Sequence, residues 1–373
     1  METVTVRVAV SGSIANDYLM RFPGSIRDQL VSDQLDRVSL SFLVDALEIR
    51  RGGVAANICF GMGKLGLGPQ LIGSVGQDFF LEYEPHLAAA GVDTSTVWVS
   101  DKYRTAMFLC TNDEDENQIA SFCPGAMGES PEIDLTNLPG DPPDPELVIV
   151  CPNDPEAMLR HTRQTREAGW ALAADPSQQL PRLDGDQVRE LIDGATYLLT
   201  NEYEAALVTS KTGWSSDEVL KHVGLRITTY SDKGCLIEAA GEPPVEVPAV
   251  PVRDDIELEP TGIGDAFRAG FFAACAQDYE LDRCAQLGSA LATCALETIG
   301  PQEYDLNPEQ MLPRIAQAYG DDAAADLEPM LTAERSAGPT TADHTQEHRT
   351  DGQDHGTSAQ GSDSLVRVLS AQE

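Results

Sequence analysis

"PTGIGDAFRAGFF", residues 260–272, brings two glycines and a carboxylate together at the start of an apolar helical pattern. Because the first N–H groups of a helix have no partner inside the helix, those of residues 262–265 form a candidate anion site. The glycines carry no side chain that would keep a phosphate away. An ionised Asp265 beside this turn could accept the proton of an attacking hydroxyl group. A helix cap is the alternative interpretation of Asp265 taken alone.

The length of 373 residues allows one large or two ordinary domains, and 42% apolar residues suffice for a sizeable core. No apolar run reaches the roughly 18 residues that a membrane helix needs. The first residues, "METVTVRVAVSG", lack the basic stretch and apolar block of a signal peptide. We therefore expect a soluble protein of the cytoplasm.

The charge balance is strongly acidic, with 61 Asp and Glu residues against 25 Lys and Arg residues. Such a surface repels polyanions, which argues against binding to nucleic acid or to anionic membranes. Self-repulsion would also loosen the fold at ordinary ionic strength, whereas molar salt shortens the Debye length to about 3 Å and removes that cost. The acid excess extends over the whole globular part, which favours adaptation to a salt-filled cytoplasm over a simple solubility bias.

Short β-rich runs alternate with helical patterns along most of the chain. This alternation indicates buried strands joined by crossover helices, and therefore a parallel sheet covered on both faces. The expected strands lie within residues 5–13, 69–76, 146–152, 170–177, 195–201 and 225–230. The expected helices lie within residues 54–65, 79–91, 154–169 and 184–194, and residues 263–331 are mostly helical.

Residues 37–50, 105–111 and 118–123 break this rhythm, because they alternate at period two without crossover helices. The last two, joined by the acidic turn "NDEDEN", predict a hairpin. We expect these segments to form a small separate sheet beside the carboxyl ends of the main strands, where it would serve as a lid. Residues 333–373 are rich in polar residues and glycine, which predicts a disordered acidic tail.

The run "GMGKLG", residues 61–66, matches the G-x-G-x-x-G dinucleotide fingerprint. That motif works only at the first turn after a strand, and this turn is expected about ten residues earlier, at Gly52 and Gly53. Close packing against the sheet, late in a helix, is therefore the favoured interpretation of these glycines. Lys64 is followed by leucine and lacks the preceding glycine of a phosphate-binding P-loop, so that motif is absent too.

Three other stretches place candidate ligands at expected strand-to-helix turns. In "RRGGVAAN" (50–57), two glycines and the small residues after them let a ligand approach the backbone, with Asn57 directed toward it. Asp17 follows the first strand, near its ligand-binding end. Asn201 and Glu204 lie on one helical face and could hold a hydrated Mg²⁺ near phosphates. Taken alone, each stretch is more simply a turn or a helix cap.

Taken together, four motifs resemble the ribokinase-like (PfkB) family of carbohydrate and nucleoside kinases, and they occur in that family's order. They are "GGVAAN" (52–57), "GSVGQD" (73–78), "NEYE" (201–204) and "PTGIGD" (260–265). The resemblance covers about residues 6–325. It implies a ribokinase-like three-layer α/β/α fold in residues 1–332, with a mostly parallel central sheet and a small inserted β-sheet lid over about 15–50 and 101–125.

Further stretches, among them "SGSIANDYLMRFPG" and "SFCPGAM", look like bacterial-type adenosine kinase, a dimeric branch of this family. This resemblance implies an ATP- and Mg²⁺-dependent enzyme that forms a homodimer. Asp265 would be the base that accepts the proton of the ribose 5′-hydroxyl, with Gly262, Ile263 and Gly264 forming the anion hole. Glu204 would face the metal ion.

The resemblance also assigns two binding sets. The substrate set would hold the ribose hydroxyls, line the pocket, stack on the base or face the phosphates, and it comprises Ser13, Asp17, Ser41, Gly53, Asn57, Phe108, Phe122 and Arg182. The nucleotide set comprises Asn201, Thr229, Gly234, Gly262 and Gly264. Phe122 could reach the base from a partner subunit. Two residues depart from the family pattern, since Ser231 stands where Gly is usual and Glu259 where Asp is usual.

The residues and the resemblance together predict phosphoryl transfer from ATP to the 5′-hydroxyl of a ribose compound, first of all adenosine in purine salvage. Phe108 and Phe122 favour a purine acceptor by stacking. A kinase for ribose 1-phosphate is the closest alternative, because a phosphate could pair with arginines, the candidates being Arg50, Arg51, Arg104 and Arg182. More distant alternatives are a dinucleotide-dependent oxidoreductase built on residues 61–66 and a non-catalytic ligand-binding protein that kept the fold.

Overall fold

A mostly parallel sheet forms the centre of the molecule. The computed structural model describes residues 6–29, 40–115, 117–139, 142–254, 256, 258–334 and 336–340. Within these residues, an eight-stranded sheet has the order β14-β13-β12-β11-β10-β9-β1-β4; it is parallel from β4 to β12, and β13 pairs antiparallel with β12 and β14. The strands are β1 (Val8–Ser11), β4 (Gln70–Ile72), β9 (Leu147–Val150), β10 (Ala171–Ala174), β11 (Ala195–Asn201), β12 (Val223–Thr229), β13 (Cys235–Glu238) and β14 (Val245–Val247).

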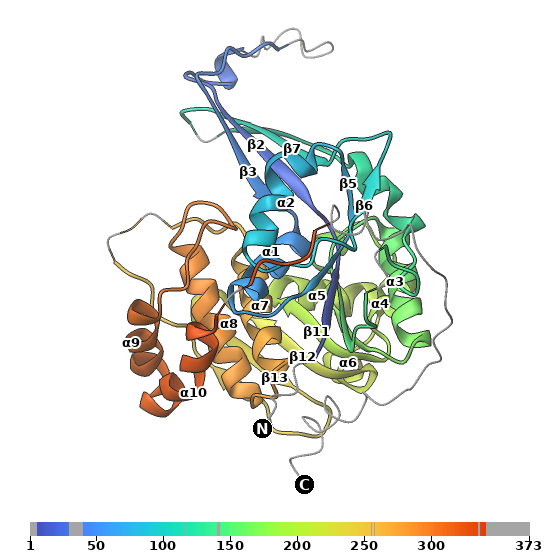
Figure 1. The fold of residues 1–373 in the computed structure, drawn as a ribbon, viewed down its shortest axis with the longest axis vertical. Helices are drawn as coiled ribbons and strands as arrows, with labels where there is room; N and C mark the ends of the chain where they lie inside the picture. The colour runs from blue at the N-terminus through green and yellow to red at the C-terminus, as the bar shows by residue number, and fades with distance from the viewer. Residues whose placement is uncertain are drawn as a thin grey trace.

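Helices cover both faces of this sheet, which gives the three layers that the sequence predicts (Figure 1). One side carries α1 (Val54–Lys64), α2 (Phe79–Ala89), α7 (Ile263–Cys275), α8 (Leu281–Leu296), α9 (Pro308–Tyr319) and α10 (Asp321–Thr332). The other side carries α3 (Pro155–Glu167), α4 (Gly185–Ile192), α5 (Glu202–Thr212) and α6 (Ser216–His222). Among the described residues, no helix is long and apolar enough to span a membrane.

Successive strand residues feed two separate cores. In β1, Val8 and Val10 face the core under α1 and α7, whereas Ala9 faces the core under α3 and α4. In β9, Ile149 faces the core under α1 and α7, and Val148 faces the core under α3 and α4. Because side chains of a strand point alternately to opposite faces, a continuous apolar run is what a strand covered on both sides requires.

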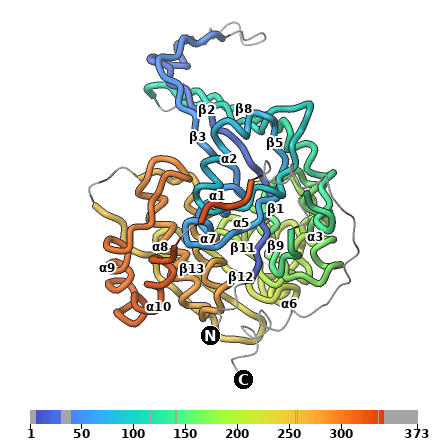
Figure 2. The backbone as a smooth tube through the Cα atoms, viewed as in Figure 1, coloured from blue at the N-terminus to red at the C-terminus, as the bar shows by residue number. Residues whose placement is uncertain are grey.

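A second sheet stands apart from the main body and projects from it as a flat arm (Figures 1 and 2). Its order is β3-β2-β7-β8, with β2 (Ala15–Arg21), β3 (Ala46–Gly52), β7 (Ala106–Asn112) and β8 (Gln118–Cys123). We call this sheet the lid. The predicted β7–β8 hairpin is confirmed, with Met107 opposite Cys123. Because β2 follows β1 after a short turn, the lid adjoins the carboxyl ends of the main strands.

The remaining elements are short. β5 (Ser74–Gly76) and β6 (Trp98–Ser100) form a separate parallel pair. Four 3₁₀ helices lie within the described residues, namely η1 (Arg27–Gln29), η2 (Gly125–Glu132), η3 (Ser177–Gln179) and η4 (Ser231–Lys233).

The expectation of extended structure over residues 37–50 holds only for its last part. β3 begins at Ala46, residues 40–45 are not in a strand, and residues 37–39 lie outside the described part. The reason is the length of the partner strand, because β2 ends at Arg21, opposite Ala46. Phe22 and Pro23 follow, and proline has no N–H group with which to extend the ladder.

The ordered chain continues beyond residue 332, where the sequence predicts that the folded part ends. Gly338 donates a backbone hydrogen bond to Ala88, and the backbone N–H and hydroxyl of Thr94 both donate to the carbonyl of Pro339. Residues 336–340 therefore pack against the segment that follows α2. The rest of the predicted tail, residues 341–373, lies outside the described residues.

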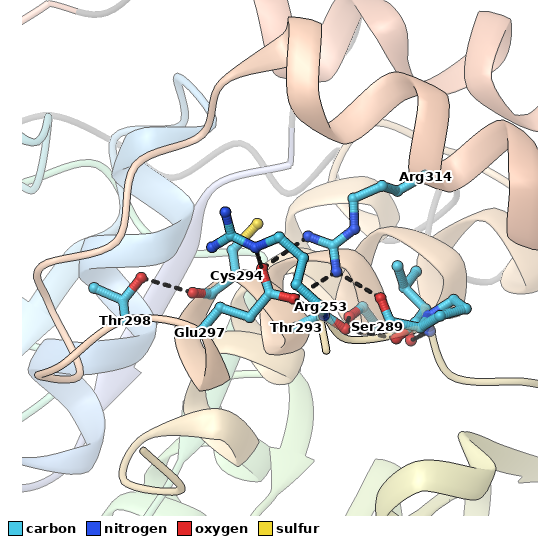
Figure 3. A network of polar contacts seen from close by, with 9 residues as sticks. Arg253, Ser289, Thr293, Cys294, Glu297, Thr298 and Arg314 are labelled. Carbon is cyan, nitrogen blue, oxygen red and sulfur yellow. Dashed lines mark hydrogen bonds and ion pairs between the residues drawn. The ribbon is translucent and has the colours of Figure 1, made fainter. Parts of the chain in front are cut away.

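A buried glutamate ties the C-terminal helices to the body (Figure 3). The carboxylate of Glu297, which follows α8, accepts hydrogen bonds from Arg253 and from Arg314 on α9 at 2.7–3.0 Å. The Arg314 guanidinium also donates to the carbonyl of Pro251. One carboxylate thus joins the loop after β14, α8 and α9, which holds the helical layer over the sheet.

Gly53 marks the crossing of the lid and the body. It lies between β3 and α1 with φ 95°, a conformation that strongly favours glycine. A Cβ atom at Gly53 would lie 2.6 Å from the carbonyl oxygen of Ser13 and 2.7 Å from the backbone nitrogen of Ala15. The start of α1 therefore passes against the segment between β1 and β2 with no room for a side chain.

We predict that Gly53→Ala destabilises the fold more than a matched left-handed glycine substitution does. Gly169, with φ 74°, has open space around its Cβ position, so Gly169→Ala should cost only the backbone strain of about 1–2 kcal/mol. Gly53→Ala should cost roughly 1–3 kcal/mol more, because backbone atoms must move. Urea-induced unfolding of both variants measures the difference. Equal losses would show that the close approach at Gly53 is not a constraint.

Candidate active site

The candidate residues gather at the carboxyl edge of the main sheet, where the strand order changes direction. β1 lies between β4 and β9, so the chain leaves β1 toward one side and returns on the other. At this point the backbone N–H of Ser13 donates to the carbonyl of Pro152, 2.8 Å away. Open α/β sheets bind ligands in the crevice at such a switch of strand order.

The predicted anion site is the first turn of α7. Gly262 caps the helix with φ 81°, and a Cβ there would lie 2.4 Å from the Cβ of Pro301. The N–H groups of Ile263, Gly264 and Asp265 belong to the first turn, where the helix itself offers no acceptor. The turn therefore presents free donors, and the helix dipole adds positive potential there.

Asp265 lies in this first turn and is held by a side chain from another helix. Its Oδ2 accepts a hydrogen bond of 2.8 Å from Nδ2 of Asn57 on α1. Burial raises the pKa of Asp265 to about 6, while the Arg268 guanidinium and the Asn57 hydrogen bond act to lower that pKa. The carboxyl group is thus ionised near neutral pH and close enough to its pKa to accept a proton.

Gln302 fixes the orientation of Asn57. Its Nε2 donates to Oδ1 of Asn57 at 2.8 Å and to the hydroxyl of Tyr83 at 2.7 Å. Tyr83 in turn donates to the carbonyl of Gly52 at 2.6 Å. Because the amide oxygen of Asn57 accepts from Gln302, the NH₂ group of Asn57 must face Asp265. No motif in the sequence marked Gln302 or Tyr83, which lie far from Asn57 along the chain.

Ser13 and Gly53 form the wall of the site between lid and body. The hydroxyl oxygen of Ser13 accepts a hydrogen bond from the backbone N–H of Val54, the first residue of α1. The hydroxyl hydrogen of Ser13 stays available to a ligand. Gly53 accepts from the N–H of Asn57. Its Cβ position faces the backbone of Ser13 and Ala15, so the missing side chain makes room for that segment, and the approach of a ligand to this turn stays a prediction.

The lid places four candidate side chains in one row. The register pairs Asp17 of β2 with Arg50 of β3 and with Phe108 of β7, and it pairs Phe108 with Phe122 of β8. Residues directly opposite each other share a face of the sheet. The row therefore reads arginine, carboxylate, aromatic, aromatic across the lid. Asp17 lies at the body end of this face, because a Cβ at Gly52 would be 3.0 Å from its Oδ2.

Asp17 carries a second raised pKa in the site. Burial raises the pKa of Asp17 to about 6, and the charge of Arg50 opposes that rise. Its position beside Gly52 and its two carboxylate oxygens suit the binding of neighbouring hydroxyl groups.

Three of the four arginines that could have bound an acceptor phosphate form ion pairs with carboxylates of the protein. Arg50 pairs with Glu48 at 2.7 Å and with Glu259 at 3.2 Å. Arg51 lies 3.4 Å from Glu303. The exposed Arg104 makes a longer pair of 3.8 Å with Asp78. The Arg50–Glu259 pair also joins the lid to the loop that leads into α7.

Asn201 and Glu204 begin α5 and form a capping box, which is the simpler of the two interpretations of "NEYE". The Asn201 side chain accepts from the N–H of Glu204, and Oε2 of Glu204 accepts from the N–H of Asn201, both at 2.8 Å. Oε1 of Glu204 accepts from the hydroxyl of Ser177. Thr229 ends the neighbouring strand opposite Asn201. The two strand ends bring Asn201, Thr229 and Glu204 to the same sheet edge.

The turn after β12 keeps the backbone that the family pattern implies. Gly234 has φ 94°, and a Cβ there would lie 2.0 Å from the carbonyl oxygen of Val247. Ser231, at a position where glycine is usual in the family, also has a positive φ of 54°. The serine therefore adopts the conformation that a glycine would take, so the turn itself is retained.

Two predicted site residues are not brought to the others. Ser41 is exposed and precedes Ala46, which lies about 20 Å along β3 from Gly52 at 3.3 Å per residue. Ser41 is thus at the distal end of the lid. Arg182 is exposed, and its neighbour Pro181 accepts from Nζ of Lys211 near the C-terminal end of α5. The backbone N–H of Arg182 donates to the carbonyl of Gln179, and within the described residues no hydrogen bond or ion pair joins Arg182 to Asn201 or Glu204.

The glycines of "GMGKLG" pack inside the fold, as the sequence indicates. α1 begins at Val54, so Gly61 and Gly63 lie in its later turns and Gly66 lies beyond its end. Cβ atoms at Gly61 and Gly63 would lie 2.5 Å from the Cβ of Ala269 and from the carbonyl oxygen of Ala90. The contacts are with α7 and the segment after α2 instead of the sheet. None of these glycines is at a helix N-terminus.

Comparison with known proteins identifies the class and then the family. The fold is that of the ribokinase-like kinases, as in the nucleoside kinase of Burkholderia thailandensis, and the chain is a kinase of that type. Residues 24–309 match the model described as pfkB family carbohydrate kinase, and the chain belongs to that family. The family predicted from the four motifs is confirmed.

The similar proteins include nucleoside kinases and a sugar-phosphate kinase. The nucleoside kinase of Methanocaldococcus jannaschii is 30% identical over 67% of this chain and 80% of the relative. The Burkholderia thailandensis nucleoside kinase in complex with inosine is 33% identical, covers 84% of this chain and 99% of that chain, and has a TM-score of 0.72. The ATP-dependent ribose-1-phosphate kinase of Halopiger xanaduensis is 27% identical over 67% of this chain and 80% of the relative. The relatives therefore point to nucleoside kinases more broadly than to adenosine kinase.

Proposed function

We propose that this protein transfers the γ-phosphoryl group of ATP to the 5′-hydroxyl of a purine nucleoside, with adenosine the first acceptor to test and purine salvage its role. Asp265 accepts the proton of the 5′-hydroxyl as that oxygen attacks. The donors of the first turn of α7 bind the negative charge of the transferred group. The two hydroxyl groups of the ribose bind Asp17 and Asn57 beside Gly53.

The row of side chains on the lid is the observation that carries this proposal. Asp17 is followed on one side by Phe108 and then Phe122, so a ribose held by Asp17 has its base beside two aromatic rings. On the other side, Arg50 is already paired with two carboxylates. An aromatic base of the acceptor can thus stack on these rings. The arginine of the row, by contrast, already has carboxylate partners within the protein and is less available to an acceptor phosphate.

The donor set also agrees with Mg²⁺ carried by the nucleotide. Among the described residues, no group of three or more His, Cys, Asp or Glu side chains is arranged to hold a metal ion. The two oxygens of Glu204 each accept one hydrogen bond and keep a second lone pair for metal-bound water. Glu204 with Asn201 would hold the hydrated shell of Mg²⁺, which would supply charge neutralisation on the phosphates when bound.

We predict that Asp265→Asn lowers kcat by roughly 10²–10⁴-fold while nucleoside binding changes little, because only the proton acceptor is lost. The wild-type kcat should fall as pH decreases below about 6, where Asp265 takes up a proton. Steady-state ADP release measures kcat and its dependence on pH, and isothermal titration calorimetry measures nucleoside binding. Turnover near the wild-type level in Asp265→Asn would remove Asp265 from the mechanism.

A kinase for ribose 1-phosphate remains the second candidate. Its support is the Halopiger xanaduensis relative together with Arg104, whose side chain is 68% exposed and 3.8 Å from its carboxylate partner. A phosphate at C1 of ribose would compete with Asp78 for this guanidinium.

Phe122→Ala distinguishes the two acceptors. If a base stacks on Phe122, KM for adenosine should rise about tenfold, since stacking on an aromatic side chain contributes roughly 1–3 kcal/mol. KM for ribose 1-phosphate should not change. Ser121→Ala, on the opposite face of β8, is the matched control. ADP release with adenosine, inosine, guanosine, cytidine, ribose and ribose 1-phosphate gives both constants. Faster turnover of ribose 1-phosphate than of every nucleoside would contradict the nucleoside assignment.

We also propose that the protein forms a homodimer and that it is adapted to a cytoplasm of high salt concentration. The face of the lid opposite Asp17 exposes apolar side chains, with Leu47 and Ile49 each 56% exposed and Ile119 41% exposed. Such a patch suits a second copy of the lid. The chain has 61 acidic and 25 basic residues, and this excess of negative charge favours a fold that is most stable at high salt concentration.

One salt series tests assembly and salt adaptation together. Between roughly 0.1 and 3 M KCl, screening should raise the midpoint of thermal unfolding by many degrees and strengthen the apolar association. Sedimentation velocity should then give the mass of two chains, and Leu47→Asp with Ile49→Asp should give one. A monomer at every salt concentration would refute the dimer. A midpoint independent of KCl would refute the salt adaptation.

A further inference from the structure

A second buried carboxylate lies behind Asp265, and an arginine stands between the two. Arg268 is one helical turn after Asp265 on α7. Its Nη2 donates to Oδ1 of Asp175 at 2.7 Å, and its Nε lies 2.6 Å from Oδ2 of the same residue. Asp175 is the first residue after β10, and its side chain is fully buried. The pair therefore joins α7 to the carboxyl edge of the sheet.

The position of this pair is not explained by stability. Removing two charges from water costs several kcal/mol each, and apolar residues of similar volume often serve a fold as well. The Arg268 guanidinium also has one nitrogen that Asp175 does not use. A Cβ at Gly264 would lie 2.7 Å from Nη1 of Arg268, so this end of the guanidinium lies against the glycine turn.

Several groups face Asp265 from the surrounding elements. Glu204 from α5 is a like charge that raises its pKa, whereas Arg268 from α7 lowers it more strongly. Burial also raises the pKa of Asp175, as do the charges of Glu204 and Asp265, whereas its ion pair with Arg268 opposes that rise. Cys151 after β9 and Tyr304 also feel the charge of Asp265, and burial raises the pKa of both so that they stay neutral. Arg268 is thus the positive charge that lowers the pKa of Asp265.

We propose that Arg268 is a positioning residue that holds a positive charge behind Asp265 and the glycine turn, and that Asp175 moderates this charge by pairing with it. The proposal rests on the proposed role of Asp265 as the base. The positive charge keeps Asp265 ionised although the carboxyl group is buried beside Glu204. The pairing with Asp175 keeps Arg268 from holding Asp265 so acidic that it no longer accepts a proton.

This arrangement predicts opposite effects for the two partners. In Arg268→Gln, the positive charge is lost and the buried Asp175 takes up a proton, so the pKa of Asp265 should rise by roughly one unit or more. In Asp175→Asn, an isosteric change, Arg268 stays charged without its partner, so the pKa of Asp265 should fall. Arg268→Lys keeps the charge and should leave the pKa of Asp265 within a few tenths of a unit.

The direct test is a titration of Asp265 that needs no turnover. Carboxyl ¹³C NMR of protein labelled at aspartate, with the Asp265 signal assigned through Asp265→Asn, gives its pKa in each variant. Arg226→Gln is the matched control, because Arg226 is a buried arginine paired with Glu238 at 2.7 Å in β12 and β13. It should destabilise the protein to a similar degree without moving the pKa of Asp265.

The outcomes separate this inference from the proposed function. Opposite shifts in Arg268→Gln and Asp175→Asn support it, and the acid limb of the kcat profile should then move with each titration. An unchanged pKa in both variants, or shifts in the same direction, would overturn it and leave the pair a structural link. Opposite shifts in a protein that phosphorylates none of the tested acceptors would sustain the electrostatic arrangement and refute the proposed acceptor alone.

Discussion

The hydrogen bond from Asn57 to Asp265 joins the two halves of the site, and much of the surrounding structure serves it. Asn57 is on α1, the helix that follows the lid, whereas Asp265 lies in the first turn of α7, the candidate anion site. The two helices come close because Gly61 leaves room for Ala269. Gln302 then determines which end of the Asn57 amide faces the carboxylate. The relative position of α1 and the Asp265 carboxylate therefore depends on one amide group.

Much of the fold can be predicted from the sequence because its signals are local. Continuous apolar runs and glycine turns mark the strands of the main sheet, and the α7 turn is recognisable since Gly262, Gly264 and Asp265 are adjacent in the chain. The misplaced glycines of residues 61–66 could be rejected by the same local argument. The order of the four motifs then identified the family, which the match over residues 24–309 confirms.

The parts that escaped prediction depend on contacts between distant residues. Arg268 and Asp175 are far apart in the chain, and an arginine within an apolar helix gives no sign of the carboxylate that it meets. Gln302 lies in a loop without periodicity. Residues 40–45 have the alternation of a strand but no partner, since β2 ends too early. For the same reason Ser41 lies at the distal end of the lid and not in the site.

Gly53 and the lid also differ in how much change of side chain they can accommodate. The wall at Gly53 has no space for a side chain, and the turn of α7 is equally crowded, so these parts tolerate little sequence drift. The outer lid strands β3 and β8, by contrast, are largely exposed, and exchanging a side chain there disturbs few neighbours. A substitution on these outer strands should therefore cost less folding free energy than one at the glycine turns, so the lid is the part of this architecture that can vary most without loss of the fold.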